Sequence, residues 1–166
     1  PAQQEQAKVE AWKKAFNDWP YDDYSWHAAR YLMNHYAAAK QHDDMAAVAL
    51  ELIRRQGAAY VEPWDRLLAY YRDVRKDDKA LRDLSLRIVS AFPGYNVTQE
   101  AYLALSDLDR RAGDAMAAAI CLHRAMAAGG RTDQQAFQKG CSVAQDLAEA
   151  GRYGEAASVL RVLMKY

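Results

Sequence analysis

The side chains best able to support chemistry in this chain of 166 residues are four histidines, two cysteines and three pairs of adjacent aspartates. The histidines, at positions 27, 35, 42 and 123, lack the spacing typical of a metal site, and His42 falls at an expected turn. The chain also has no phosphate-binding glycine loop and no Gly-x-Ser-x-Gly motif. We therefore expect no catalytic residue, no metal and no cofactor, and we interpret the protein as a non-enzyme.

The paired aspartates are better explained as helix caps than as acid-base dyads. Aspartate at a turn accepts hydrogen bonds from the free backbone N–H groups of the helix that follows. Ser25 and Thr98 are expected to cap helices in the same way, and Gly113 and Asp114 are expected to end one helix and begin the next. The three pairs are Asp22-Asp23, Asp43-Asp44 and Asp77-Asp78.

The two cysteines leave two interpretations open. Cys121 and Cys141 lie in consecutive expected helices that should touch, so a single disulfide between them is geometrically conceivable. A lone cysteine on a helix face is more often a small buried apolar residue.

Composition excludes several classes of partner. Lysine plus arginine and aspartate plus glutamate both number 22, and the two signs are interspersed, so no basic stripe is available for nucleic acid. No apolar run approaches the roughly 18 to 20 residues that span a bilayer. We expect a soluble single domain without direct membrane insertion, and both a cytoplasmic and, in a bacterium, a periplasmic location remain open.

Turn signals recur at nearly constant spacing. Steps of 37, 36 and 37 residues separate Pro20, Gly57, Pro93 and Gly130. A fixed period of this length indicates stacked helix pairs. A second set of turns is expected between them, near Asp43, Asp77, Asp114 and Gly151. Eight turns predict nine helices, of which the first, over residues 3–18, has no partner within its own pair.

Each expected helix has one apolar face at helical spacing. Ala118, Leu122 and Ala125 form such a face, in which small residues allow a neighbouring helix to approach closely. The face of the first helix is expected to include Trp19, and the face of the third to include Leu50. The abundant aromatic residues are interpreted mostly as core.

The positions of the turns and of the apolar faces predict which individual side chains are buried. Trp64, Tyr71 and Leu122 should be buried, whereas Arg54 and Arg55 should face solvent. Pro63 suits the first turn of a helix, where its missing N–H costs nothing.

Several of these residues resemble the tetratricopeptide repeat. The resemblance rests on three groups of residues: Trp12, Ala15 and Pro20; Trp64, Leu67, Tyr71 and Ala80; and Gly151, Tyr153, Ala156 and Leu160. The resemblance implies an all-α fold, a right-handed superhelix (solenoid) of about nine helices in one domain over residues 1–166. An N-terminal helix over 1–20 would be followed by repeats 21–57, 58–93, 94–130 and 131–166. The chain departs from the pattern at Gly140, where the family has an aromatic residue.

The resemblance also implies a protein-interaction scaffold that holds a partner segment in a concave groove lined by the first helix of each pair. The partner is a protein or peptide of unknown identity. The residues expected to face it are His27, Arg30, Tyr31, Asn34, Glu62, Asp65, Arg66, Asp107 and Arg110. Arg30 and Asn34, one helical turn apart, resemble the pair that clamps a peptide carboxylate in some tetratricopeptide domains.

Two other functions remain open. The chain could be an accessory or regulatory domain of a larger envelope or secretion-related protein or enzyme. It could also be a superhelical hydrolase, although no constellation of residues supports catalysis.

Overall fold

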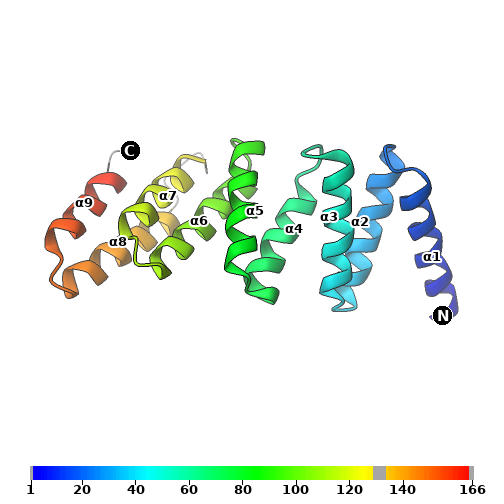
Figure 1. Cartoon of the computed structure of the whole chain (residues 1–166), viewed down its shortest axis with the longest axis horizontal. Coiled ribbons are helices and arrows are strands. Elements are labelled where there is room, and N and C mark those ends of the chain that lie inside the picture. Colours follow the sequence, from blue (N-terminus) through cyan, green and yellow to red (C-terminus); the bar gives the residue numbers. More distant parts are fainter. Residues whose placement is uncertain (1, 129–133, 165–166) are drawn as a thin grey trace. The chain divides into compact units, whose positions relative to one another are not determined.

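The computed structural model describes residues 2–128 and 134–164, and the elements within these ranges are nine α-helices and one π-helical segment, with no strand (Figure 1). The expected all-α class is confirmed. The expected turn near Gly130 lies outside the described residues.

The chain divides into two compact units, residues 1–76 and residues 77–166. The single-domain description therefore stays a prediction, and each unit is described by itself. Unit 1 contains α1 (Ala2–Asp18), α2 (Asp23–Ala38), α3 (His42–Gln56), α4 (Glu62–Ala69) and the π-helix η1 (Tyr70–Arg75). Unit 2 contains α5 (Asp78–Ala91), α6 (Asn96–Arg111), α7 (Ala115–Ala128), α8 (Gln134–Glu149) and α9 (Tyr153–Leu163).

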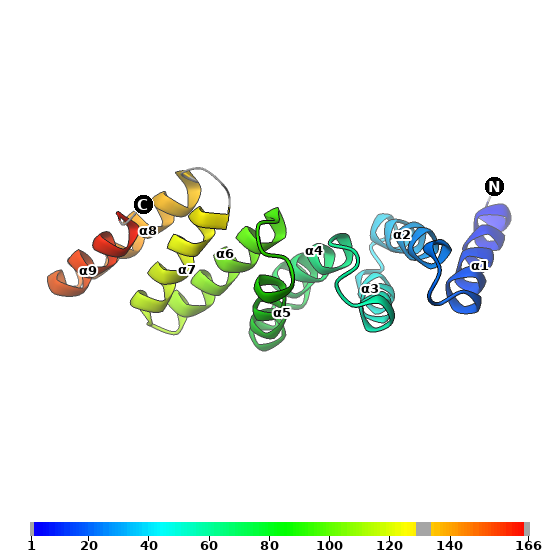
Figure 2. The same cartoon turned by 90° about the horizontal axis from the view of Figure 1, so that it is seen from above.

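Consecutive helices pack against one another within each unit, as Figures 1 and 2 show. In unit 1, side chains of α1, α2 and α3 share one apolar cluster: Val9, Phe16, Ala28, Ala29, Leu32 and Leu52. In unit 2, α7 contacts both α8 and α9, and Leu122 is fully buried in the cluster that these helices share with α6. Ala118 and Ala125 are also fully buried, so the close-packing face expected on α7 is confirmed.

The expected role of aspartate as a helix cap is confirmed at three turns. The Asp22 carboxylate accepts from the N–H of Tyr24, 3.4 Å away, at the start of α2. Asp77 and Asp114 accept from backbone N–H groups in the same way at the starts of α5 and α7. Each carboxylate satisfies a donor that the first helical turn leaves without a partner.

Other predicted caps are wrong. The pair Asp43-Asp44 lies inside α3, whose N-cap residue, Gln41, makes no side-chain cap hydrogen bond. Ser25 is not the cap of α2, because Asp22 holds that position and Ser25 is buried inside the helix. Thr98 lies in the first turn of α6, and its hydroxyl donates to the carbonyl of Phe92 in the preceding turn.

A π-helical segment, η1, follows α4. Trp64 is 3% exposed, as expected, and the regular α-helical period ends at Ala69. Tyr70 is buried, and its hydroxyl donates to Asp43. Tyr71 is only partly buried, so its predicted core position is wrong. Burial, followed by the Asp43 contact, raises the pKa of Tyr70 to about 12.

Several residues that were expected in the core are exposed instead. Trp19 and Leu50 are exposed, because no described helix covers that side of the α1–α2 turn or of α3. The prediction that aromatic residues are mostly core is wrong, since Tyr21, Tyr24 and Tyr153 are exposed as well. Other exposed aromatic side chains are Tyr95 and Phe137.

Arg54 faces solvent as predicted, but Arg55 does not. The Arg55 guanidinium lies 4.3 Å from the ring centroid of Phe16 and only a tenth of its side chain is exposed. Its long aliphatic stem and planar head can cover an aromatic ring while its polar atoms find acceptors.

Candidate functional site

Four of the expected groove residues of unit 1, Arg30, Asn34, Glu62 and Arg66, lie together where α2 faces α4. Arg30 Nε is 3.3 Å from Glu62 Oε2, and Arg66 Nη2 is 2.6 Å from Glu62 Oε1. Arg66 also donates to Asn34 Oδ1 at 2.5 Å. Arg30 and Asn34 therefore each contact a side chain of α4, and a partner carboxylate would have to compete with those contacts.

The other expected groove residues of unit 1 lie in different surroundings. His27 and Asp65 are exposed on α2 and α4. Tyr31 faces α1, where its ring stacks on Trp12 and its hydroxyl donates to Glu5 Oε1 at 2.7 Å. That hydrogen bond to Glu5 raises the pKa of Tyr31.

An analogous set of contacts joins α6 to α8 in unit 2. Lys139 Nζ is 2.9 Å from Asp107 Oδ2, and Arg110 Nη2 is 3.2 Å from Asp146 Oδ2. The Lys139–Asp107 contact joins residues 32 positions apart, the same separation as the Arg66–Asn34 contact of unit 1. Polar side chains thus join α2 to α4 in unit 1 and α6 to α8 in unit 2.

Arg110 also lines a cavity of about 220 Å³ in unit 2, which we call the α8 socket. The socket lies beside the turns that end α6 and α8. Val143 and Leu147 of α8 contribute its buried apolar wall, and Asp146 and Arg152 contribute charge. Its remaining lining residues are Gly113, Ala115 and Ala150.

The α6–α7 interface contains a polar cluster that sequence reasoning missed. Asp109 is buried, and its Oδ1 accepts from Arg82 Nη2 at 2.7 Å. Its Oδ2 accepts from the Cys121 thiol at 3.7 Å. Burial, with a smaller effect of the Asp109 charge, raises the pKa of Cys121 to about 11. Because the thiolate is the reactive form, this thiol is a poor nucleophile near neutral pH.

Both cysteines are free thiols in the structure. Of the two interpretations left open by the sequence, the disulfide is therefore absent, and Cys121 serves as a partly buried hydrogen-bond donor to Asp109.

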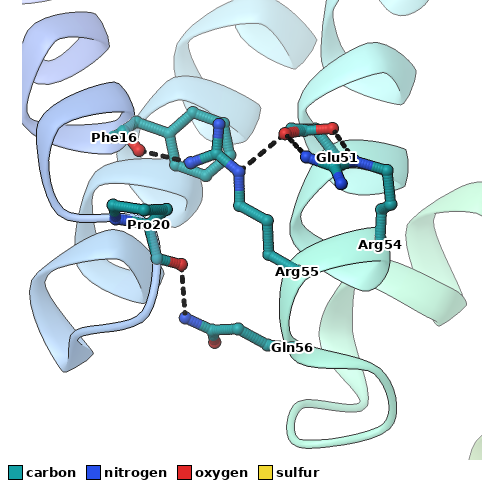
Figure 3. Close-up of polar contacts among 6 residues, drawn as sticks. All are labelled: Phe16, Pro20, Glu51, Arg54, Arg55 and Gln56. Carbon is teal, nitrogen blue, oxygen red and sulfur yellow. Dashed lines mark hydrogen bonds and ion pairs between the residues drawn. The ribbon is translucent and has the colours of Figure 1, made fainter.

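The turn between α1 and α2 is held by the end of α3 (Figure 3). Arg55 Nη1 donates to the carbonyl of Phe16 at 2.5 Å, and Gln56 Nε2 donates to the carbonyl of Pro20 at 3.5 Å. Glu51 Oε1 accepts from Arg55 Nε at 2.7 Å, and the same carboxylate accepts from Arg54. These hydrogen bonds from the two arginines lower the pKa of Glu51 to about 2.

The described residues offer neither an evident metal site nor a membrane-crossing helix. Across residues 2–128 and 134–164, no three side chains of histidine, cysteine, aspartate or glutamate gather closely enough to hold a metal ion. No helix in the same ranges combines the length and apolarity needed to cross a bilayer.

Comparison with protein-family models yields no match, and comparison with curated proteins also yields none.

Proposed function

We propose that the protein is a non-catalytic scaffold of tetratricopeptide-like helix pairs that binds a segment of a partner protein along its first helices. The observation that carries this proposal is the α8 socket, because Arg110, expected from sequence to face the groove, stands at its edge. The contacts between α2 and α4 support a similar polar surface in unit 1.

The socket has the size and lining to accept one apolar side chain. Its volume of about 220 Å³ is below the roughly 300 to 1,000 Å³ of pockets for small organic ligands. Val143 and Leu147 supply apolar surface, which would gain stability on losing contact with water. A side chain presented by a larger partner fits this description better than a free metabolite does.

Arg110 supplies a polar contact beside the apolar wall. One terminal nitrogen of its guanidinium contacts Asp146, and a guanidinium carries five N–H donors in total. The remaining donors can bind carbonyl groups of a partner backbone. Protein interfaces usually combine a buried apolar anchor with polar contacts around it.

The proposal is tested with the whole chain and a library of random peptides. Peptides selected for binding to the wild-type protein are measured by isothermal titration calorimetry against Arg110→Ala and against Ala150→Leu, which fills the socket. Loss of a charged hydrogen bond should weaken binding to Arg110→Ala by about 1.5 to 3 kcal/mol. Ala150→Leu should weaken binding by a similar amount because the socket no longer accepts an anchor.

Arg111→Ala is the matched control. Arg111 is also an exposed arginine of α6 paired with an aspartate, Asp78, at 2.7 Å, but it does not line the socket. The affinity of the Arg111→Ala variant for the selected peptides should equal that of the wild type. Selected peptides that bind Arg110→Ala and Ala150→Leu as tightly as the wild type would refute the proposed site.

A further inference from the structure

The turn from Asp18 to Tyr24, which we call the acidic aromatic turn, exposes three large aromatic side chains. Trp19 is 54% exposed, Tyr21 81% and Tyr24 62%. The ring centroids of Trp19 and Tyr24 lie 6.1 Å apart, with the ring planes at 52°, so the two exposed side chains are neighbours. Clustered exposed aromatic residues are typical of interaction sites, since a fold gains nothing from leaving them in water.

The surface of this turn is hollowed and carries only negative charge. The hollow has a volume of about 520 Å³ and is lined by Asp18, Trp19, Pro20, Tyr21, Asp22 and Asp23. Among the described residues, no lysine or arginine lines it. Arg54 of α3 interacts electrostatically with Tyr21, but its guanidinium is held by Glu51 at 2.6 Å.

Asp18 is the carboxylate of this turn that has no hydrogen-bonding or ion-pair partner within residues 2–128 and 134–164. Asp22 caps α2, and Asp23 accepts from the hydroxyl of Tyr60 at 3.3 Å. Asp18 ends α1, and no hydrogen bond or ion pair to it occurs among the described residues. The carbonyl end of a helix carries partial negative charge, so a carboxylate there lowers stability and attracts a cation.

The turn is held in place by the helices behind it. Arg55 and Gln56 donate to the carbonyl groups of Phe16 and Pro20, on either side of Trp19 (Figure 3). A surface held in position loses less conformational entropy on binding than a free loop does.

We propose that the acidic aromatic turn binds an arginine side chain of a partner polypeptide. The guanidinium would stack on Trp19 and Tyr24 while its N–H groups pair with the Asp18 carboxylate. A planar guanidinium suits this site because it stacks on aromatic faces and also donates to carboxylates. The α8 socket plays no part in this inference, so either proposal can fail without the other.

The test uses a capped octapeptide of alternating arginine and glycine, together with an analogue in which citrulline replaces each arginine. Citrulline keeps the planar shape but carries no charge. Titration of the whole 15N-labelled chain is followed by NMR. The arginine peptide should give saturable shifts at Trp19, Tyr21 and Tyr24, and the citrulline peptide should bind at least about tenfold more weakly.

Two variants test the residues that carry the inference. Asp18→Asn and Trp19→Ala should each raise the dissociation constant for the arginine peptide at least about threefold. Both should remain folded, because each side chain is exposed. Asp18→Asn should also keep or raise the melting temperature, which separates lost binding from lost structure.

Asp83→Asn, an exposed aspartate of α5, is the control and should leave the affinity unchanged. Equal binding of the two peptides, unchanged affinity of Asp18→Asn, or shifts confined to residues outside the turn would each overturn the inference.

Discussion

At the scale of single residues, Trp64 shows how one side chain can hold a turn and a helix together. Its indole is buried at the start of α4, and its Nε1 donates to the carbonyl of Gly57 at 3.3 Å. The carbonyl belongs to the turn that ends α3, where Gly57 has a φ of +60°. The indole thus fills the core and satisfies an acceptor at the end of the preceding helix.

Replacing Trp64 with alanine should destabilise the protein by about 3 to 5 kcal/mol, the range for removing a large aromatic side chain from a core. Urea unfolding followed by circular dichroism measures the change. Trp19→Ala is the control and should change stability by less than about 0.5 kcal/mol, because that indole is 54% exposed. Equal stability of Trp64→Ala and the wild type would contradict the packing of the Trp64 indole in the core.

At the scale of helices, the close contact of α8 with α9 explains the glycine at position 140. A Cβ atom built on Gly140 would lie 2.3 Å from Cδ1 of Leu163. Leu163 is 2% exposed and has little room to move. The space beside position 140 of α8 is thus occupied by the Leu163 side chain of α9.

Gly140→Phe should therefore destabilise the protein by about 1 to 3 kcal/mol or more, as overpacking does. Gly154→Ala is the matched control, because a Cβ at Gly154 meets no atom within 4 Å. Higher helix propensity should make that variant more stable by up to about 1 kcal/mol. Thermal unfolding distinguishes the two, and a stabilising Gly140→Phe would mean that α9 packs differently.

At the scale of the molecule, ion pairs in both units lower the pKa values of carboxylates. Bonds from Arg54 and Arg55 lower the pKa of Glu51 from 4.5 to about 2. Arg72 lowers the pKa of Asp73, and in unit 2 Arg152 lowers the pKa of Glu155. A carboxylate with a lower pKa in the folded state adds stability above its unfolded pKa and loses it as protonation proceeds.

The protein should consequently lose stability as pH falls from about 4.5 towards 2, the interval between the unfolded and folded pKa values of Glu51. Urea unfolding at pH 7 and at pH 3 measures the loss. Glu51→Gln should be less stable at pH 7 by about 1 kcal/mol, since the pair is partly solvated, and should lose less on acidification. An identical pH dependence of the variant and the wild type would exclude Glu51 as a contributor.

The amino-acid sequence determined the features that depend on local interactions. The recurring turns and aspartate caps placed the helices, because hydrogen bonding within a turn and the 3.6-residue period act over a few neighbouring positions. The burial of Trp64 and Leu122 followed from the same period. The polar residues Arg30, Asn34 and Glu62 also lie together, because they occupy the facing sides of α2 and α4.

Only the tertiary structure decided which apolar helix faces are covered by a neighbouring helix and which charged side chains contact another part of the protein. Arg54 and Arg55 are adjacent in sequence, yet only Arg55 reaches Phe16, because only its side of α3 faces α1. Tyr70 is buried in place of Tyr71, and its hydroxyl donates to Asp43, a residue of α3 that lies 27 positions earlier in the chain. Trp19 lies on a predicted apolar face, but no helix of the described part of the chain covers it. Burial depends on the position of neighbouring helices, and this is set by the packing of side chains far apart in the chain.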